Sequence, residues 1–342
     1  MKKITFLMLS CLVAFAVNAQ VFVENFETAT VGGDLEGYNN WYVSLKSADA
    51  LGVSPKIALG SLSFTGYAGS GVGNVAVLDS VVGTTSETQR ISTKIVAFGT
   101  DTLHAVVGEK IYAAFLINVS NHSYHSYRDF FTFEGSKTGS MTRGRIFAKI
   151  DAAGSELTFA ITKNSSSTSN YVESSSISGL TLTTGTANLL VFVYEAVDGD
   201  NNDKQTLYIN PDLSKSEAEQ TNKLETIDVQ SDYSEPSNIG INLRQRGVGA
   251  QIGGIRVGKS WDAVLTGDGT GVKTITSSPI RILGKSIITE NEGTLSIYNF
   301  SGSLLVNAPT NGRYDTSLKK GLYLARFTDI TGNTYSRKIE LF

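Results

Sequence analysis

The sequence predicts an all-β protein, and three observations support this prediction. Short apolar runs rich in Val, Ile, Phe and Tyr recur along the chain, each of about the length of a strand. Turn-forming residues separate the runs, and the 342 residues include 34 glycines. A helical period is nearly absent, and only residues 213–224 are predicted to form a short surface helix. Many short strands with such spacing are typical of a β-sandwich or barrel.

In one predicted strand, "KIYAAFLINV", apolar residues occupy both the odd-numbered and the even-numbered positions. Ile111, Phe115 and Ile117 lie on one face, and Tyr112 and Leu116 lie on the other. This pattern predicts a central strand that is covered on both sides. The other predicted strands are, in chain order, "VFVENFE", "NVAVLDSVV", "QRISTKIVAF", "DFFTFEG", "GRIFAKIDA", "ELTFAITK", "NLLVFVYEAV", "QTLYINP", "IGINLRQRG" and "IGGIRVG".

The chain is predicted to hold two folded parts after an export signal. Residues 1–19 combine a basic start, an apolar run and small side chains before Gln20, which indicates a signal peptide. The stretch "LTGDGTGVKTITSS" breaks the strand pattern and predicts a linker over 265–279. We therefore expect one domain over 20–264 and a smaller β domain over 280–342.

Composition excludes several classes of function. The formal net charge is −3, so binding to nucleic acid is not expected. Beyond the signal, no apolar run is long enough to predict a transmembrane segment. The single cysteine, Cys11, lies in the signal, which leaves no disulfide, thiolate metal site or cysteine nucleophile in the mature chain.

The larger domain resembles the laminin-G-like or concanavalin-type jelly rolls of secreted bacterial surface proteins. The resemblance rests on "ENFE" with "NNWYVS", "GSLSFTGYAGSGVGN", "DGDNNDKQTLYINPDLS" and the closing "IGGIRVGKSWDAV". It implies a concanavalin-like jelly-roll β-sandwich in which the first and last strands pair. Fold-level likeness leaves the function open.

The C-terminal part resembles the sorting domain of the type IX secretion system of Bacteroidetes. The matching features are "TLSIYNFSGSLL", "KKGLYLARF" and "GNTYSRKIELF", in this order and at the end of the chain. The resemblance implies a small β-sandwich with a fixed last strand, the secretion machinery as partner, and a secreted or cell-surface location. The residues that carry it are Gly302, Gly321, Tyr323, Arg337 and Lys338.

Two loops are candidate binding sites. In "DGDNNDK", Asp198, Asp200 and Asp203 crowd oxygen ligands that suit Ca²⁺, although the EF-hand pattern is incomplete and a plain hairpin loop is the favoured interpretation. In "NHSYHSYRD", the His-x-x-His spacing would chelate a metal only through a turn, and a polar loop is favoured. Sugar-contacting aromatic residues are a further possibility, with these candidates: Trp41, Tyr42, Tyr124 and Tyr127.

No catalytic motif is found. Glycoside hydrolases of this fold align carboxylates on one strand face, whereas Glu225 and Asp228 are three residues apart and point to opposite faces. We therefore expect an exported, non-catalytic surface protein that binds a glycan. The alternatives are a divergent glycoside hydrolase or lyase of concanavalin-like fold, and a structural surface component or adhesin.

Overall fold

The computed structural model divides the chain into two compact units, Met1–Gly271 and Val272–Phe342. The structure describes residues 20–47, 54–80, 91–95, 103–104, 106–123, 125–135, 142–164, 167–226, 230–233, 239–266, 280–283, 285–299, 303–330 and 334–341. No helix in these ranges is long and apolar enough to cross a membrane.

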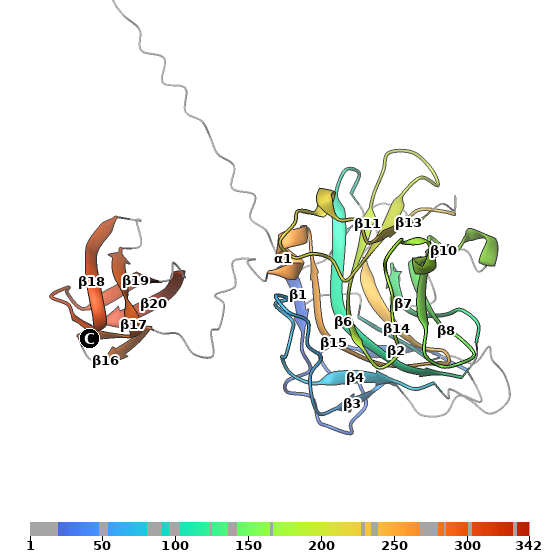
Figure 1. Ribbon diagram of the computed structural model, residues 1–342, viewed down its shortest axis with the longest axis horizontal. Coiled ribbons are helices and arrows are strands. Elements are labelled where there is room, and N and C mark those ends of the chain that lie inside the picture. Colours follow the sequence, from blue (N-terminus) through green and yellow to red (C-terminus); the bar gives the residue numbers. More distant parts are fainter. Residues whose placement is uncertain are drawn as a thin grey trace, which may run out of the picture. The chain divides into compact units, whose positions relative to one another are not determined.

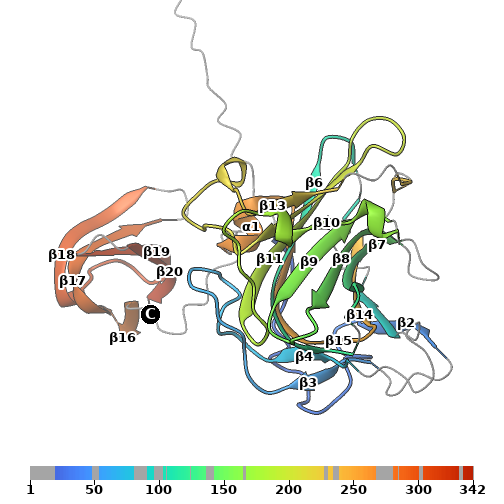
Figure 2. The same ribbon diagram turned by 45° about the vertical axis from the view of Figure 1, so that its right-hand side comes forward.

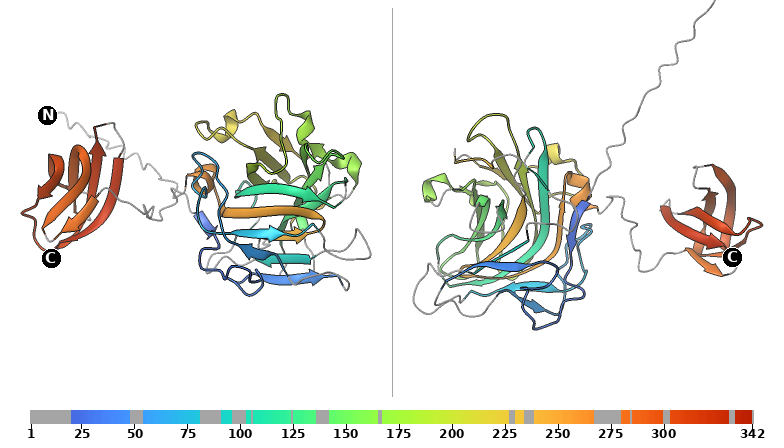
Figure 3. Two further views of the ribbon diagram at one scale, coloured as in Figure 1. Left: turned by 60° about the horizontal axis from the view of Figure 1, so that its bottom comes forward. Right: turned by 180° about the vertical axis from the view of Figure 1, so that it is seen from behind.

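The larger unit is a sandwich of two antiparallel sheets (Figure 1). One sheet has eight strands in the order β13-β12-β11-β6-β15-β4-β3, and β1 pairs with β15. Figure 3 shows β6, β15 and β4 side by side in this sheet. Its strands are β1 Gln20–Glu24, β3 Lys56–Ala58, β4 Val75–Leu78, β6 Lys110–His122, β11 Ala187–Glu195, β12 Lys204–Ile209, β13 Lys223–Glu225 and β15 Val248–Gly258.

The other sheet has seven strands in the order β10-β9-β8-β7-β14-β5-β2. Figure 2 shows β10, β9 and β8 following one another on one side of the unit. The strands are β2 Tyr42–Lys46, β5 Ile91–Ile95, β7 Arg128–Glu134, β8 Thr142–Ile150, β9 Leu157–Thr162, β10 Val172–Glu173 and β14 Gly240–Gln245. The all-β jelly-roll prediction is confirmed, as is the pairing of the first strand, β1, with the last, β15.

Aromatic side chains from both sheets interlock in the core. Phe115 of β6 stacks on Phe131 of β7 with ring centroids 4.4 Å apart. Phe192 of β11 stacks on Phe133 of β7 at 4.9 Å. All four rings are fully buried, and burying each apolar side chain contributes about 1.5–3 kcal/mol to folding. This packing fixes the position of β7 between its neighbours and thereby positions the residues on its opposite face.

The central strand β6 is covered on both faces, as the sequence predicts. Ile111, Phe115 and Ile117 belong to the core between the sheets. Tyr112 and Leu116 belong to a second apolar cluster on the outer face, with Trp261 and Leu265 of helix α1 (Trp261–Leu265). The expected helix over 213–224 is reduced to a single 3-10 turn at Glu217–Glu219, closed by a Ser216–Glu219 capping box.

The C-terminal unit contains one five-stranded antiparallel sheet with its own buried cluster (Figure 1). Its strands are β16 Ile280–Leu283, β17 Ser286–Tyr298, β18 Leu304–Asp315, β19 Gly321–Asp329 and β20 Thr334–Leu341. The pairing of β17 with β18 is interrupted between Ile288 and Glu292, and β16 lies in contact with β20. The single sheet therefore folds over onto itself and encloses a core. Its last strand is paired along its length and ends on the buried Leu341.

Candidate functional site

A row of polar side chains crosses the outer face of the seven-stranded sheet. Cross-strand partners have side chains on the same face, so the pairing register defines the row. The consecutive partners, from β2 to β9, are Tyr42, Lys94, Asn242, Thr132, Arg145 and Thr162. We call this surface, with the charged residues beside the row, the polar face. The opposite side of the same strands contributes to the apolar core.

Asp129 of β7 lies at the centre of a cluster of three guanidinium groups. Its Oδ2 accepts a hydrogen bond from Arg145 Nη2 at 3.0 Å and another from Arg244 Nη1. Its Oδ1 accepts from Arg246 Nη1 at 2.7 Å. Burial by itself would raise the pKa of Asp129, but the three arginines outweigh it and hold the pKa well below its ordinary value. One carboxylate against three guanidiniums leaves an excess of positive charge.

Arg246 is the cation of this cluster that is most open to solvent. Its side chain is 20% exposed, against 9% for Arg145 and 5% for Arg244. The Nε of Arg246 has no hydrogen-bond partner among the described residues. A planar guanidinium that remains partly exposed is suited to bind a carboxylate.

Two buried side chains of the row also have unused hydrogen-bonding atoms. Asn242 is 1% exposed and Thr132 is fully buried. Within the described part of the chain, neither Asn242 Oδ1 nor Thr132 Oγ1 has a partner. Because a buried polar atom without a partner costs about 1–3 kcal/mol, these two atoms mark a point of the polar face where the described residues leave hydrogen bonds unmade.

A second ion pair extends the polar face toward β2 and β5. Lys94 Nζ lies 3.3 Å from Glu134 Oε2, which also accepts from Thr142 Oγ1 at 3.3 Å. Burial lowers the pKa of Lys94, and the nearby Glu134 opposes this effect. Tyr42 is the cross-strand partner of Lys94 and is partly exposed. Burial, followed by the charge of Glu134, raises the pKa of Tyr42 to about 12.

A β-bulge explains why sequence analysis misses this site. Asp129 and Glu134 are five residues apart, so simple alternation places them on opposite faces. The register of β7 against β8 shifts between Asp129 and Phe131, which turns Asp129 to the same face as Thr132 and Glu134. The sequence identifies "DFFTFE" as a strand, but it contains no glycine or other sign of a bulge there.

The candidate aromatic residues occupy different environments. Trp41 is 1% exposed and packs in the core, with Nε1 donating to Glu24 Oε2 at 3.4 Å. Tyr42 lies in the row of the polar face, as the cross-strand partner of Lys94. Tyr127 packs edge-on against Tyr171 at 5.1 Å, and Lys149 Nζ lies over its ring at 4.6 Å. Tyr124 lies outside the described residues.

The three candidate calcium ligands do not converge. Asp203 is buried and its carboxylate accepts from the Tyr194 hydroxyl and from Val197 N, at 2.8 Å for the latter. Asp198 and Asp200 are exposed. In the described ranges, no group of three His, Cys, Asp or Glu side chains could hold a metal ion. The loop is better described as the hairpin connection between β11 and β12.

The histidine loop and the acidic segment likewise take structural positions. His122 Nε2 and His125 Nδ1 lie 3.2 and 3.4 Å from the carbonyl oxygens of Ala148 and Ile150, both on β8. Burial lowers the pKa of His122 to about 4, so this ring is neutral at neutral pH. Glu225 is exposed at the end of β13, and Asp228 lies outside the described residues.

Of the candidate sorting residues, most belong to the last two strands. Gly321 and Tyr323 lie in β19, and Tyr323 donates to the carbonyl oxygen of Lys319 at 2.8 Å. Arg337 and Lys338 lie in β20, opposite Ala325 and Leu324. Gly302 lies outside the described residues. Their role in sorting stays a prediction.

No family model and no curated protein sequence matches the chain. Similar solved structures include an alginate lyase from Pseudomonas aeruginosa, with 9% identity, 56% of this chain and 83% of that chain covered, and a TM-score of 0.35. An endo-β-1,4-glucuronan lyase from Trichoderma reesei has 13% identity, coverages of 72% and 99%, and a TM-score of 0.36. A structure reported with endo-acting O-glycanases of the human gut microbiota has 10% identity, coverages of 70% and 99%, and a TM-score of 0.37.

These similar structures contradict the expectation of a non-catalytic protein. The proteins named above are lyases or are reported as glycanases, whereas the sequence favours a binding protein without activity. That expectation is therefore corrected. The expectation is based on the spacing of carboxylates in the sequence of single strands. Such spacing cannot reveal a polar face that is assembled from four strands, β5, β7, β8 and β14.

Proposed function

We propose that this protein is a polysaccharide lyase that cleaves an anionic, uronate-containing glycan on the polar face of the seven-stranded sheet. The observation that carries the proposal is the arginine cluster around Asp129, beside Asn242 Oδ1 and Thr132 Oγ1, which have no partner in the part of the chain that the structure describes. Elimination from a uronate requires that the substrate carboxylate be neutralised, since this acidifies the proton on the neighbouring carbon. Arg246 and the NH₂ group of the Asn242 amide, which are both hydrogen-bond donors, are suited to this task.

The charge state of the carboxylates favours a lyase over a glycoside hydrolase. A hydrolase needs a carboxylic acid with a raised pKa that reaches the glycosidic oxygen. Asp129 is fully buried and its pKa is held well below the ordinary value, so it cannot serve as a proton donor. Glu134 is also fully buried and is paired with Lys94. Both carboxylates act as counter-ions that position the cations.

Tyr42 is the residue to which we assign proton transfer. It is partly exposed, and its partner across the strand pair is Lys94, which in turn is the partner of Asn242. Adjacent strands lie about 4.8 Å apart, so Tyr42 and Asn242 are separated by about 10 Å, which a bound sugar can span. With a pKa of about 12, the phenol is protonated at neutral pH and can donate a proton to the leaving oxygen as the C4–O bond breaks. The proton of the neighbouring carbon passes to solvent water, and the electron pair of the broken C–H bond forms the C4–C5 double bond of the unsaturated uronate.

Incubation of the mature chain with a panel of uronate polysaccharides tests this proposal. Alginate, glucuronan and pectate serve as anionic substrates, and cellulose derivatives without carboxylates serve as neutral ones. A lyase produces an unsaturated uronate that absorbs in the ultraviolet, whereas a hydrolase produces only new reducing ends. Reducing ends without ultraviolet absorbance would indicate hydrolysis, and no cleavage of any anionic polymer would refute the proposal.

We also propose that the protein is exported and delivered to the cell surface or medium. The support is the signal-like segment over 1–19 and the likeness of residues 280–342 to type IX sorting domains. An extracellular location suits an enzyme whose substrate is a large polymer that cannot enter the cell.

A further inference from the structure

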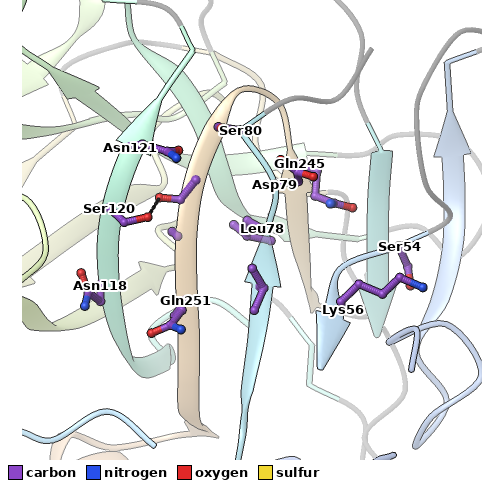
Figure 4. A pocket seen from close by; sticks show the side chains of 13 residues that line it. Ser54, Lys56, Leu78, Asp79, Ser80, Asn118, Ser120, Asn121, Gln245 and Gln251 are labelled. Carbon is purple, nitrogen blue, oxygen red and sulfur yellow. Dashed lines mark hydrogen bonds between the residues drawn. The ribbon is translucent and has the colours of Figure 1, made fainter. Parts of the chain in front are cut away.

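A cavity of about 500 Å³ is lined mainly by residues of the eight-stranded sheet, together with Gln245 at the end of β14 in the other sheet. The residues of the polar face do not line it. Figure 4 shows Asn118, Ser120 and Asn121 on β6, Gln251 on the adjacent β15, and Lys56 with Ser54 at the other side. Its volume falls within the range of about 300–1,000 Å³ that is usual for small-molecule sites. Neutral amide and hydroxyl groups are prominent in its lining.

The floor of the cavity is a cross-strand row. The consecutive partners from β6 to β3 are Asn118, Gln251, Val77 and Lys56. Since partners in register share a face, these four side chains point to the same side of the sheet. A rigid row on four paired strands is a preformed binding surface rather than a loop that must be ordered.

Two amide oxygens that line the cavity have no partner among the described residues. They are Asn118 Oδ1 and Gln245 Oε1, and Gln245 is only 5% exposed. Ser120, in contrast, is satisfied, because its hydroxyl donates to the carbonyl oxygen of Gly249 at 3.3 Å (Figure 4). A buried, unpartnered amide at the wall of a cavity indicates that a polar ligand completes its hydrogen bonds.

The charges around the cavity exclude an anionic ligand. The only described cation in its lining is Lys56, and Lys56 Nζ lies 2.9 Å from Asp34 Oδ1, which neutralises it. Asp79 adds a carboxylate to the lining. A uronate would be repelled here, whereas amides that both donate and accept match the hydroxyl groups of a neutral sugar.

We propose that this cavity is a second glycan-binding site, specific for a neutral, hydroxyl-rich oligosaccharide and separate from the site of cleavage. It would hold the enzyme on a mixed polymer or on a neighbouring neutral glycan while the polar face acts on uronates. The binding claim does not depend on the lyase activity, because the two sites share no residue.

Calorimetric titration of the mature chain with neutral cello-, xylo-, manno- and galacto-oligosaccharides tests the claim. We expect at least one series to bind. Gln251→Ala should weaken that binding about three- to tenfold, as expected for the loss of one or two hydrogen bonds. Ser120→Trp should abolish it, because Ser120 is exposed at the cavity and a large side chain there fills the space.

The exposed Gln230 provides a matched control, since Gln230→Ala removes the same amide away from the cavity and should not change binding. Ser120→Trp should also leave any cleavage of uronate polymers unchanged, which separates this claim from the proposed activity. The claim is overturned if no neutral series binds or if Ser120→Trp binds as tightly as the wild type. It is also overturned if the cavity captures uronate oligosaccharides instead.

Discussion

At the residue scale, Asp129 sets the character of the polar face. A carboxylate that is fully buried is costly unless charged partners compensate for its desolvation. Arg145, Arg244 and Arg246 do so, and in return the carboxylate fixes their orientation. Replacing Asp129 would therefore affect both stability and the geometry of the cations.

Asp129→Asn should lower the free energy of unfolding by about 3–5 kcal/mol, because three buried or half-buried guanidiniums would lose their counter-ion. Denaturant titration of the variant and the wild type measures the difference. Asp200→Asn, at an exposed loop position, should change stability by less than about 0.5 kcal/mol. Equal effects of the two substitutions would show that the cluster does not stabilise the fold.

The depressed pKa of Asp129 also predicts a pH dependence. Since the folded pKa lies below the unfolded value of about 3.9, the stabilisation is fully present above that value. It decreases as the pH falls below about 4, where the unfolded chain takes up the proton first. Acid titration of stability should show this loss in the wild type and a smaller loss in Asp129→Asn. Identical acid profiles would contradict the assignment.

At the scale of elements, the sequence predicts the strands better than their irregularities. The sequence pattern identifies β6 as a strand covered on both faces, because apolar residues point to each of its two faces. The bulge in β7 leaves no such trace, since Phe130 and Phe131 both belong to the core and look like an ordinary apolar pair. The pairing of β7 with β8 and β14 also brings Arg145 and Arg244 to the carboxylate of Asp129. These residues are far apart in the sequence, so no local sequence pattern predicts the contact.

A second irregularity, at Gly144 of β8, lies between Arg143 and Arg145. Its φ is +86°, and a Cβ there would meet Phe192 Cζ and Gln205 Cγ, both at 3.1 Å. Gly154 has a similar φ of +76°, but no described atom lies within 4 Å of the position that a Cβ would take there. The two glycines thus share a left-handed backbone but differ in packing.

Gly154→Ala should cost about 1 kcal/mol, the penalty of a left-handed conformation alone. Gly144→Ala should cost about 1–3 kcal/mol more, because the core must also shift to admit the methyl group. Denaturant titration of both variants isolates the packing contribution. If the two costs agree, the close contact at Gly144 is not a constraint on β8.

At the scale of the whole molecule, two units have separate cores. The central cluster of the larger unit and the cluster of the C-terminal unit have no residue in common. The C-terminal sheet ends on a paired strand with Ile339 and Leu341 buried. Each unit is therefore expected to unfold as a cooperative entity.

Removal of residues 272–342 should leave the melting temperature of the larger unit unchanged, because its core is complete without them. Differential scanning calorimetry of the full chain and of residues 20–271 measures this. A marked decrease in the melting temperature of the shortened chain would show that the units depend on each other for stability.

Deletion of residues 280–342 should abolish surface delivery in the native cell, if the C-terminal unit is the sorting signal that its likeness implies. Fractionation with an antibody against the larger unit follows the protein. Intracellular retention of the shortened form supports the assignment, and undiminished surface delivery would contradict it.

The most direct test of the central claim is the ultraviolet assay on uronate polysaccharides with Arg246→Ala beside its control Arg326→Ala, an exposed arginine of the C-terminal unit. We expect cleavage by the wild type and by Arg326→Ala, and a decrease in kcat/KM of about tenfold or more for Arg246→Ala, as the loss of a charge-assisted contact of about 1.5–3 kcal/mol predicts. Cleavage by Arg246→Ala at the wild-type rate would show that the polar face is not where the anionic glycan is held.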